Sequence, residues 1–301
     1  MLGPTGSGKS ALALEIARQV GGEIVGCDSV QVYRGFDIGT AKVSRAERRG
    51  VPHHLIDLVD ATAVFTAGEY ARVARDVLRD IAARGRVPIV VGGTGFYLRA
   101  LLEGLSPGPE RDPDLRERLA ERERRRPGSL HRILTRLDSK AAGRIHPNDR
   151  NKTMRALEVC LLERRPMTAL FEQGRDPLTG FRTVKLGLDP PREKLYARLN
   201  ERTRRMFERG LLDEVHGLID SGVPQNAKPL QSLGYRQALD AIEGRATLAQ
   251  AIEATEVETR QYAKRQLTWF RLESAVRWFQ AFGDDPGTQR EALTIVSGCR
   301  E

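Results

Sequence analysis

Residues 2–13, LGPTGSGKSALA, decide the fold of this 301-residue chain. Their core has the pattern G-x-x-x-x-G-K-[ST] of a phosphate-binding loop, formed by Gly3, Pro4, Thr5, Gly6, Ser7, Gly8, Lys9 and Ser10. Such glycines let backbone N–H groups surround phosphate oxygens, while the lysine reaches the terminal phosphates and the last hydroxyl contacts Mg²⁺. The four-residue spacing of Leu12, Ile16 and Val20 predicts a helix after the loop, with the positive end of its dipole directed at the anion.

Strands that alternate with helices follow this loop. Residues 23–27 are typical of a short strand that ends before Asp28, and residues 87–91 of a stronger one that ends three residues before Thr94. This alternation indicates a parallel α/β sheet. Ligands bind outside the carboxyl ends of the strands in such sheets, so we expect the phosphate loop, Asp28 and Thr94 to meet around one crevice.

These two polar residues have a chemical and a structural interpretation. Asp28 can accept a proton or hold a metal, and Thr94 can donate a hydrogen bond to an oxygen of a leaving phosphate. Alternatively, Asp28 caps a turn and Thr94 caps a helix. Their positions in the sequence leave both interpretations open.

The phosphate loop by itself suggests ATP and a kinase. Kinases and ATPases with such a loop hold Mg²⁺ with an aspartate at the end of a hydrophobic strand. Residues 55–57, Leu-Ile-Asp, fit this requirement poorly, and the strand at 87–91 is followed by glycine rather than by aspartate. The sequence therefore argues mildly against ATP chemistry.

The N-terminus carries no sign of targeting. There is no basic stretch followed by an apolar signal region, and no apolar run is long enough to cross a bilayer, so we expect a cytoplasmic protein. Only Met1 and Leu2 precede the phosphate loop. We therefore expect the strand that normally leads into it to be truncated, or the true start to lie upstream.

Basic residues are concentrated in two places. The chain carries a net charge of +9, and between Arg111 and Arg155 there are 14 Lys and Arg against 7 Asp and Glu. A solvated helical surface is the simplest interpretation of one such run. Residues 198–209 place four arginines on one helical face, which suggests an anionic partner. The three cysteines are far apart and predict neither a disulfide framework nor a metal pair.

Several long motifs resemble the tRNA dimethylallyltransferases, also called tRNA isopentenyltransferases. In chain order they are GPTGSGKSALA, CDSVQVYRGFDIGTAK, VPHHLIDLVD, VGGTGFYLRALLEG, RIHPNDRNKTMRALEV, RRMFERGLLDEV and YAKRQLTWFR. The resemblance implies an α/β fold: a P-loop NTPase-like core with a parallel sheet flanked by helices, plus an inserted small helical domain. We expect residues 1–110 and 182–301 to form the catalytic core, and residues 111–181 to form the insertion.

The resemblance also implies a reaction. In this family the phosphate loop holds the diphosphate of dimethylallyl diphosphate, with Mg²⁺ bound through Ser10. The dimethylallyl group goes to N6 of adenosine 37, beside the anticodon of tRNAs reading codons that begin with U, and pyrophosphate leaves. Asp28 matches the general base, and Thr94 matches the threonine that hydrogen-bonds the bridging oxygen. Arg202 matches the arginine of the pattern R-x-x-x-M-x-x-x-G-L.

Further positions match residues that contact tRNA in the family. They are Asp28, Ser29, Val30, Gln31, Thr94, Arg116, Asn151, Lys152, Arg155, Lys264 and Arg265. Asn151 and Lys152 depart from the Gln-Arg pair that the family often has there. The basic run falls in the insertion, which grips the anticodon stem-loop in the family. The resemblance therefore favours an RNA-binding surface over a solvated one.

Three alternatives are weighed against this interpretation. An adenylate isopentenyltransferase acts on a free nucleotide, but the basic insertion and YAKRQLTWFR favour tRNA. A small-molecule kinase needs ATP and a metal-binding acid that the sequence does not place. An RNA-binding protein with a relic phosphate loop stays an alternative because the first strand is missing, although Lys9, Ser10, Asp28 and Thr94 are all present. No strong dimer seam is visible, so we expect a monomer.

Overall fold

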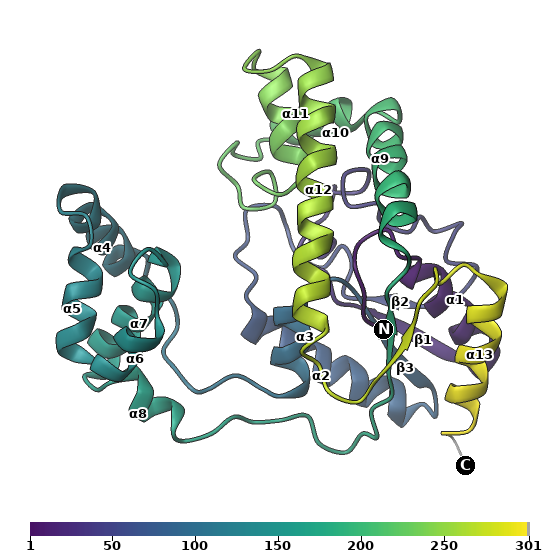
Figure 1. Cartoon of the computed structure of the whole chain (residues 1–301), viewed down its shortest axis with the longest axis horizontal. Coiled ribbons are helices and arrows are strands. Elements are labelled where there is room, and N and C mark those ends of the chain that lie inside the picture. Colours follow the sequence, from purple (N-terminus) through teal and green to yellow (C-terminus); the bar gives the residue numbers. More distant parts are fainter. Residues whose placement is uncertain (300–301) are drawn as a thin grey trace. The chain divides into compact units, whose positions relative to one another are not determined.

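The computed structural model describes residues 1–299, which form two compact units (Figure 1). The first, here called the core unit, consists of residues 1–101 and the chain from Thr179 onward. The second, here called the helical unit, consists of Leu102–Leu178. None of the helices within residues 1–299 is both long and apolar enough to span a membrane.

Parallel strands form the centre of the core unit. β1 (Gly22–Gly26) lies between β2 (His53–His54) and β3 (Val87–Val91), while β4 (Lys185–Leu188) pairs with β5 (Val276–Phe279). Leu2 forms a parallel bridge with Gly187, and the Met1 nitrogen donates to the Val90 carbonyl at 2.9 Å. Met1 and Leu2 therefore lie between β3 and β4 and pair with both. The predicted α/β class with a parallel sheet is confirmed.

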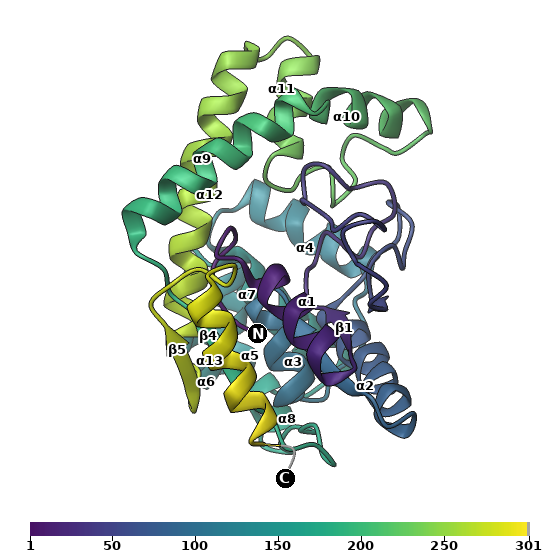
Figure 2. The same cartoon turned by 90° about the vertical axis from the view of Figure 1, so that its right-hand side faces the viewer.

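Helices cover both faces of this sheet (Figures 1 and 2). α1 (Lys9–Val20) and α13 (Pro286–Ser297) pack together on one face, and α2 (Ala67–Ala83) and α3 (Gly95–Leu102) lie on the other. The connections through α1 and α2 run in opposite directions across the sheet, so right-handed crossovers place these helices on opposite faces. α1 buries Leu12, Ile16 and Val20, as their spacing predicted.

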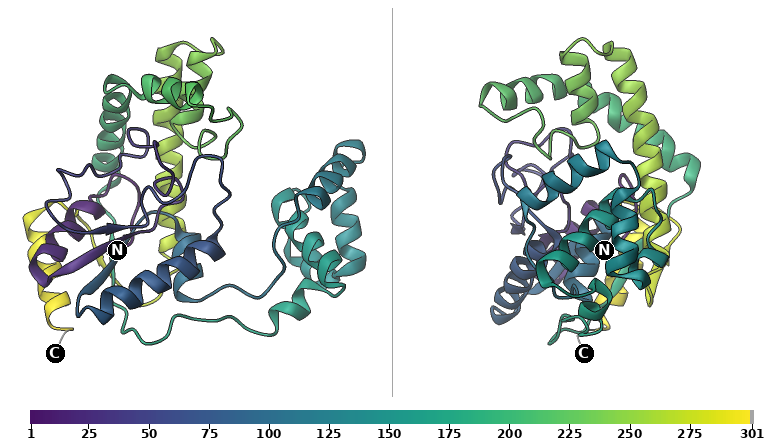
Figure 3. Two further views of the ribbon diagram at one scale, coloured as in Figure 1. Left: turned by 180° about the vertical axis from the view of Figure 1, so that it is seen from behind. Right: turned by 90° about the vertical axis from the view of Figure 1, so that its left-hand side faces the viewer.

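Four further helices complete the core unit: α9 (Arg192–Glu208), α10 (Leu211–Asp220), α11 (Tyr235–Ile242) and α12 (Leu248–Phe270). α9 and α12 are neighbours (Figure 3), and the contacts of Arg204 with Glu256 and of Asn200 with Arg260 show that they run antiparallel. Arg204 on α9 pairs with Glu256 in the N-terminal half of α12, and Leu199 packs on Ala263 further along it. This helix pair forms a wall above the phosphate loop.

The helical unit contains five short helices: α4 (Pro113–Arg125), α5 (Ser129–Leu137), α6 (Ser139–Arg144), α7 (Arg150–Glu163) and α8 (Met167–Phe171). Leu119, Leu134 and Leu157 are among the residues of its apolar core. Aspartates cap α4, α6 and α7, because Asp112, Asp138 and Asp149 each accept a hydrogen bond from a first-turn N–H. Pro127 and Gly128 lie between α4 and α5.

Candidate active site

The phosphate loop owes its shape to three glycines with positive φ. Gly3, Gly6 and Gly8 have φ of 137°, 75° and 89°, a region that other residues rarely adopt. Distant segments also approach each of them. A Cβ on Gly3 would lie 2.7 Å from the Leu188 carbonyl oxygen, and one on Gly6 would lie 2.6 Å from Cδ2 of Leu199. β4 and α9 therefore hold the loop from outside.

Lys9 and Ser10 lie where the loop enters α1. The Lys9 ammonium donates to the Pro4 carbonyl at 2.7 Å, so its side chain folds back over the loop. Burial and the nearby Arg202 guanidinium lower the pKa of Lys9 to about 7. Ser10 is exposed. The first-turn N–H groups of α1 have no partner within the helix and carry the positive end of its dipole, which suits an anion.

Arg202 on α9 connects the phosphate loop to a second loop. Its guanidinium donates to the Thr5 hydroxyl at 3.2 Å and to the Thr40 carbonyl at 3.5 Å. The same carbonyl accepts a hydrogen bond from the Gln31 amide at 3.0 Å. Burial lowers the pKa of Arg202, and the negative charge of Asp28 acts in the opposite direction. A cation is thus held beside the loop and close to a carboxylate.

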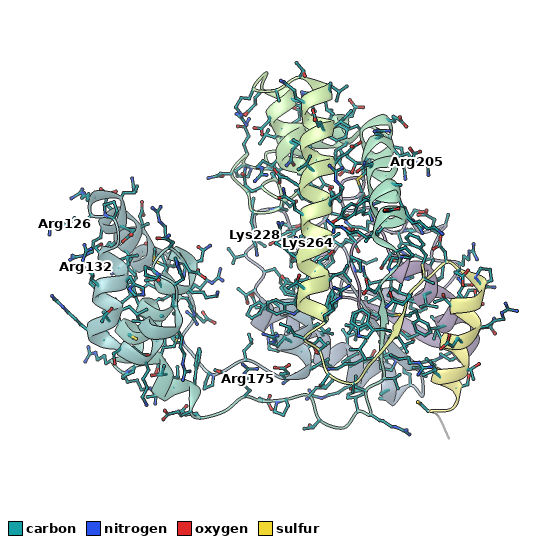
Figure 4. All side chains as sticks on the ribbon, viewed as in Figure 1. Arg126, Arg132, Arg175, Arg205, Lys228 and Lys264 are labelled. Carbon is teal, nitrogen blue, oxygen red and sulfur yellow. The ribbon has the colours of Figure 1, made fainter. Side chains whose placement is uncertain are left out.

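Two other arginines of the predicted anionic-partner face, Arg198 and Arg205, pair with acidic residues. Arg198 forms a two-pronged pair with Asp284, at 2.8 and 2.9 Å. Arg205 pairs with Glu201 at 2.9 Å and projects outward from α9 (Figure 4). The helical spacing identified the face, but these acidic partners were not identified from it.

Asp28 caps a turn with one carboxylate oxygen and, among the residues described, keeps the other oxygen free of hydrogen bonds. Its Oδ1 accepts hydrogen bonds from the backbone N–H groups of Val30 and Gln31, at 2.9 and 3.2 Å. This is the expected turn. Within residues 1–299, Oδ2 accepts no hydrogen bond, and the residue lines a cavity. The second oxygen is therefore available to a substrate.

Thr94 lies beside the Asp28 turn. Its hydroxyl accepts a hydrogen bond from the Ser29 N–H at 3.1 Å and approaches the Ser29 hydroxyl to 3.4 Å. Its own N–H donates to the Cys27 carbonyl at 3.2 Å. The ends of β1 and β3 are thereby joined, as the convergence of parallel strands predicted.

One cavity of about 390 Å³ lies between the phosphate loop, the Asp28 turn and the α9–α12 pair, and Lys9, Ser10 and Thr94 are not among its lining residues. It is lined by Thr5, Asp28, Ser29 and Val30 at one side and by Arg202, Met206, Tyr262 and Arg265 of the α9–α12 wall. Leu199 and Leu233 add apolar surface. Lys264 does not line this cavity and is exposed on α12 (Figure 4). The structure thus brings Thr5, Asp28, Arg202 and Arg265 around one space.

Sequence reasoning missed two residues that hold these loops. The side chain of Gln266, next to Arg265, accepts from the Thr5 N–H and donates to the Gly93 carbonyl, both at 2.8 Å. Glu214 on α10 accepts from the N–H groups of residues 37–39, ahead of Thr40. Gln266 lies in the motif YAKRQLTWFR, which was a signal of its importance, whereas no local pattern marks Glu214.

In the helical unit, two predicted tRNA contacts share one buried partner. Arg116 and Arg155 donate to the same oxygen of Glu158, at 3.2 and 2.7 Å. Glu158 is fully buried, and its other oxygen accepts from the Asp112 N–H at 2.9 Å. The remaining two predicted contacts, at 151 and 152, are exposed in the first turn of α7.

The oxygen donors around the phosphate loop suit a magnesium ion that is held mainly by the phosphate oxygens of a bound ligand. No group of three or more His, Cys, Asp or Glu side chains that could hold a metal occurs in residues 1–299. Mg²⁺ binds oxygen, keeps several waters and is commonly held by one or two protein groups plus substrate phosphates. The exposed Ser10 hydroxyl can supply one such protein oxygen.

Residues 31–273 match the family described as IPP transferase. The chain belongs to the IPP transferase family. It is 59% identical over 98% of its length to the tRNA dimethylallyltransferase of Solibacter usitatus, of which it covers 96%. A second relative in Koribacter versatilis, also named tRNA dimethylallyltransferase, is 57% identical over the same shares of both chains.

Solved structures agree with this membership of the IPP transferase family. The full-length tRNA isopentenylpyrophosphate transferase of Bacillus halodurans is 37% identical, with a TM-score of 0.72 over 99% of this chain and 94% of that one. A eukaryotic dimethylallyltransferase acting on tRNA is 28% identical, with a TM-score of 0.85 over 99% of this chain and 78% of that one.

Proposed function

We propose that this chain transfers the dimethylallyl group of dimethylallyl diphosphate to N6 of adenosine 37 in tRNA. The tRNAs are those that read codons beginning with U, and pyrophosphate is released. The observation that carries the proposal is the single cavity, because it exposes a phosphate-loop residue, a cation and a carboxylate to the same space. Thr5, Arg202 and Asp28 all line it.

The phosphate side of the cavity suits a departing diphosphate. Charge builds on this group as the allylic C1–O bond breaks, so catalysis needs positioning and charge neutralisation. Lys9, Arg202 and the start of α1 supply positive charge. The Thr94 hydroxyl is assigned to the bridging oxygen, which keeps the electron pair of the broken bond.

Asp28 is suited to accept a proton from the attacking amine. The N6 amine attacks C1, a new N–C bond forms, and one N6 proton must leave. Oδ2 of Asp28 takes this proton, while Oδ1 stays fixed by two backbone N–H groups. Because the adenine of a stacked anticodon loop cannot enter a cavity, the base is extruded first.

Magnesium is the proposed metal. Ser10 would hold it together with the diphosphate oxygens, as the donor set allows. When bound it would neutralise charge on the leaving pyrophosphate.

The proposed tRNA surface includes residues of both units. Ser29, Val30, Gln31, Lys264 and Arg265 belong to the core unit, whereas Arg116, Asn151, Lys152 and Arg155 belong to the helical unit. Their guanidinium, ammonium and amide groups suit phosphate and sugar oxygens. The anticodon stem-loop is the part of the tRNA that we assign to them, and a monomeric enzyme is expected to carry out the reaction.

The deciding experiment incubates the purified protein with unmodified tRNA, Mg²⁺ and dimethylallyl diphosphate, without ATP. The tRNA is then digested, and its nucleosides are analysed by mass spectrometry. We expect N6-dimethylallyladenosine, located at position 37 by fragment mapping. Parallel reactions replace tRNA with AMP, or add ATP.

Each reaction has a distinct meaning. Product from AMP as readily as from tRNA would indicate a nucleotide-modifying enzyme. Phosphate transfer from ATP, with no prenyl product, would indicate a kinase. A tRNA whose adenosine 37 is replaced by guanosine is the negative control for position.

A further inference from the structure

Gln266 is a buried amide that joins two loops of the active site. Only 6% of its surface is exposed. Its Oε1 accepts from the Thr5 N–H in the phosphate loop, and its Nε2 donates to the Gly93 carbonyl in the loop after β3, both at 2.8 Å. These partners are 261 and 173 residues away in the sequence. One side chain of α12 therefore connects both loops.

Each of these loops leads directly to a group that the proposed function assigns to the diphosphate. The Thr5 hydroxyl accepts a hydrogen bond from the Arg202 guanidinium, and Gly93 immediately precedes Thr94. A change in the spacing between the two loops would therefore move the phosphate loop relative to the Thr94 hydroxyl. Small displacements of this kind have large effects on catalysis, because reacting groups must be held within a narrow range of distances.

The contacts require an amide at this position. The side chain must accept at one end and donate at the other, which glutamine does and which glutamate and methionine do not. The space is also tight. A Cβ on Gly93 would lie 2.3 Å from the Gln266 Nε2 atom, so the amide and the glycine fit only together.

We propose that Gln266 is a positioning residue that sets the distance between the phosphate loop and Thr94, and so controls the binding of the diphosphate group. The inference rests on the proposed function. It predicts that loss of the amide affects the diphosphate side of the reaction and spares the binding of tRNA.

The test compares Gln266→Met, Gln266→Glu and Gln261→Met with the wild type. Gln261→Met makes the same replacement at an exposed position of α12 and is the matched control. Two measurements are made: steady-state kinetics with each substrate varied in turn, and calorimetric binding of inorganic pyrophosphate with Mg²⁺. The second does not depend on turnover.

For Gln266→Met we expect kcat to fall about tenfold to a hundredfold and the Kd of pyrophosphate to rise at least about fivefold. KM for tRNA should stay within about twofold of the wild type. Gln266→Glu should bind pyrophosphate more weakly still, since it adds a negative charge beside the loop. Gln261→Met should match the wild type.

Equal pyrophosphate affinity in all four proteins would overturn the inference. A parallel loss in both KM values, together with a lower melting temperature, would show a role in folding only. If Gln266→Met does not fold, Gly93→Ala approaches the same contact from the other side. An inactive wild type that still binds pyrophosphate in an amide-dependent way would contradict the proposed function and leave the inference standing.

Discussion

Arg202 and Thr5 are 197 residues apart in the sequence, and a hydrogen bond of 3.2 Å joins the guanidinium of the first to the hydroxyl of the second. The Arg202 guanidinium also reaches the Thr40 carbonyl. It therefore contacts the loops on both sides of the cavity. Lysine has the same charge but cannot direct donors along two fixed directions at once.

Replacement of Arg202 should show this difference. We expect Arg202→Met to reduce kcat about a hundredfold, and Arg202→Lys to reduce it about tenfold. Single-turnover rates at saturating substrates measure the effect. Arg205→Met, one turn further along α9 and paired with Glu201 outside the cavity, is the control and should retain activity. Equal rates for the lysine variant and the wild type would contradict the role assigned to the planar guanidinium.

Asp28 combines a turn with the proposed base, and two variants separate these roles. Asp28→Asn keeps an oxygen that can accept the Val30 and Gln31 N–H groups, but it cannot take a proton at pH 7. We expect turnover to fall about 10²- to 10⁴-fold with tRNA binding retained. Asp28→Ala should lose the turn as well and bind tRNA less well. Filter binding and product formation distinguish the two, and an active asparagine variant would remove Asp28 as the base.

The Thr94 hydroxyl is expected to act on the leaving group. Thr94→Val should slow the chemical step about 10²-fold, the loss typical of one oriented donor in an active site. Thr94→Ser keeps the hydroxyl and should retain most of the rate. Rapid-quench measurement of product formation tests both variants. A valine variant that changes only KM would assign Thr94 to binding.

The lowered pKa of Lys9 predicts that pyrophosphate binding depends on pH. Its pKa is lowered to about 7, so much of it is neutral above that pH, although a bound anion favours the charged form. Binding should therefore take up a proton, and affinity should fall as the pH rises from about 7 towards 9. Lys9→Arg stays charged throughout and should show a smaller decrease. Calorimetry in two buffers of different ionisation enthalpy measures the proton uptake, and identical pH profiles would contradict the assignment.

Glu158 should control the stability of the helical unit. Glu158→Gln removes the buried charge that receives Arg116 and Arg155. We expect the free energy of unfolding to fall by about 2 kcal/mol. The affinity for tRNA should fall with it, while kcat at saturating tRNA stays near the wild type. Chemical denaturation and tRNA titrations test this, with Glu163→Gln, a partly exposed residue of α7, as the control.

Local patterns predicted the elements, and long-range contacts decided how the site is held. The spacing of Leu12, Ile16 and Val20 marked α1, because a buried helix face leaves a regular trace in the sequence. The partners of Arg198 and Arg116 left no such trace. Asp284 and Glu158 reach them only through tertiary packing, so the basic residues could be picked out from the sequence but these ion pairs could not. The same holds for Gln266, whose two contacts cross most of the chain.

The glycines of the phosphate loop have a further consequence for protein engineering. A Cβ on Gly8 would lie 2.7 Å from the Gly283 nitrogen, as close as the approaches of Leu188 to Gly3 and of Leu199 to Gly6. Three segments that are remote in the sequence thus pack against the eight-residue phosphate loop and fix its conformation. Grafting the motif alone into another sheet would transfer its sequence but not the contacts that fix its conformation. Conversely, a substitution at Gly283 would disturb the phosphate loop, although the two are separated by nearly the entire length of the chain.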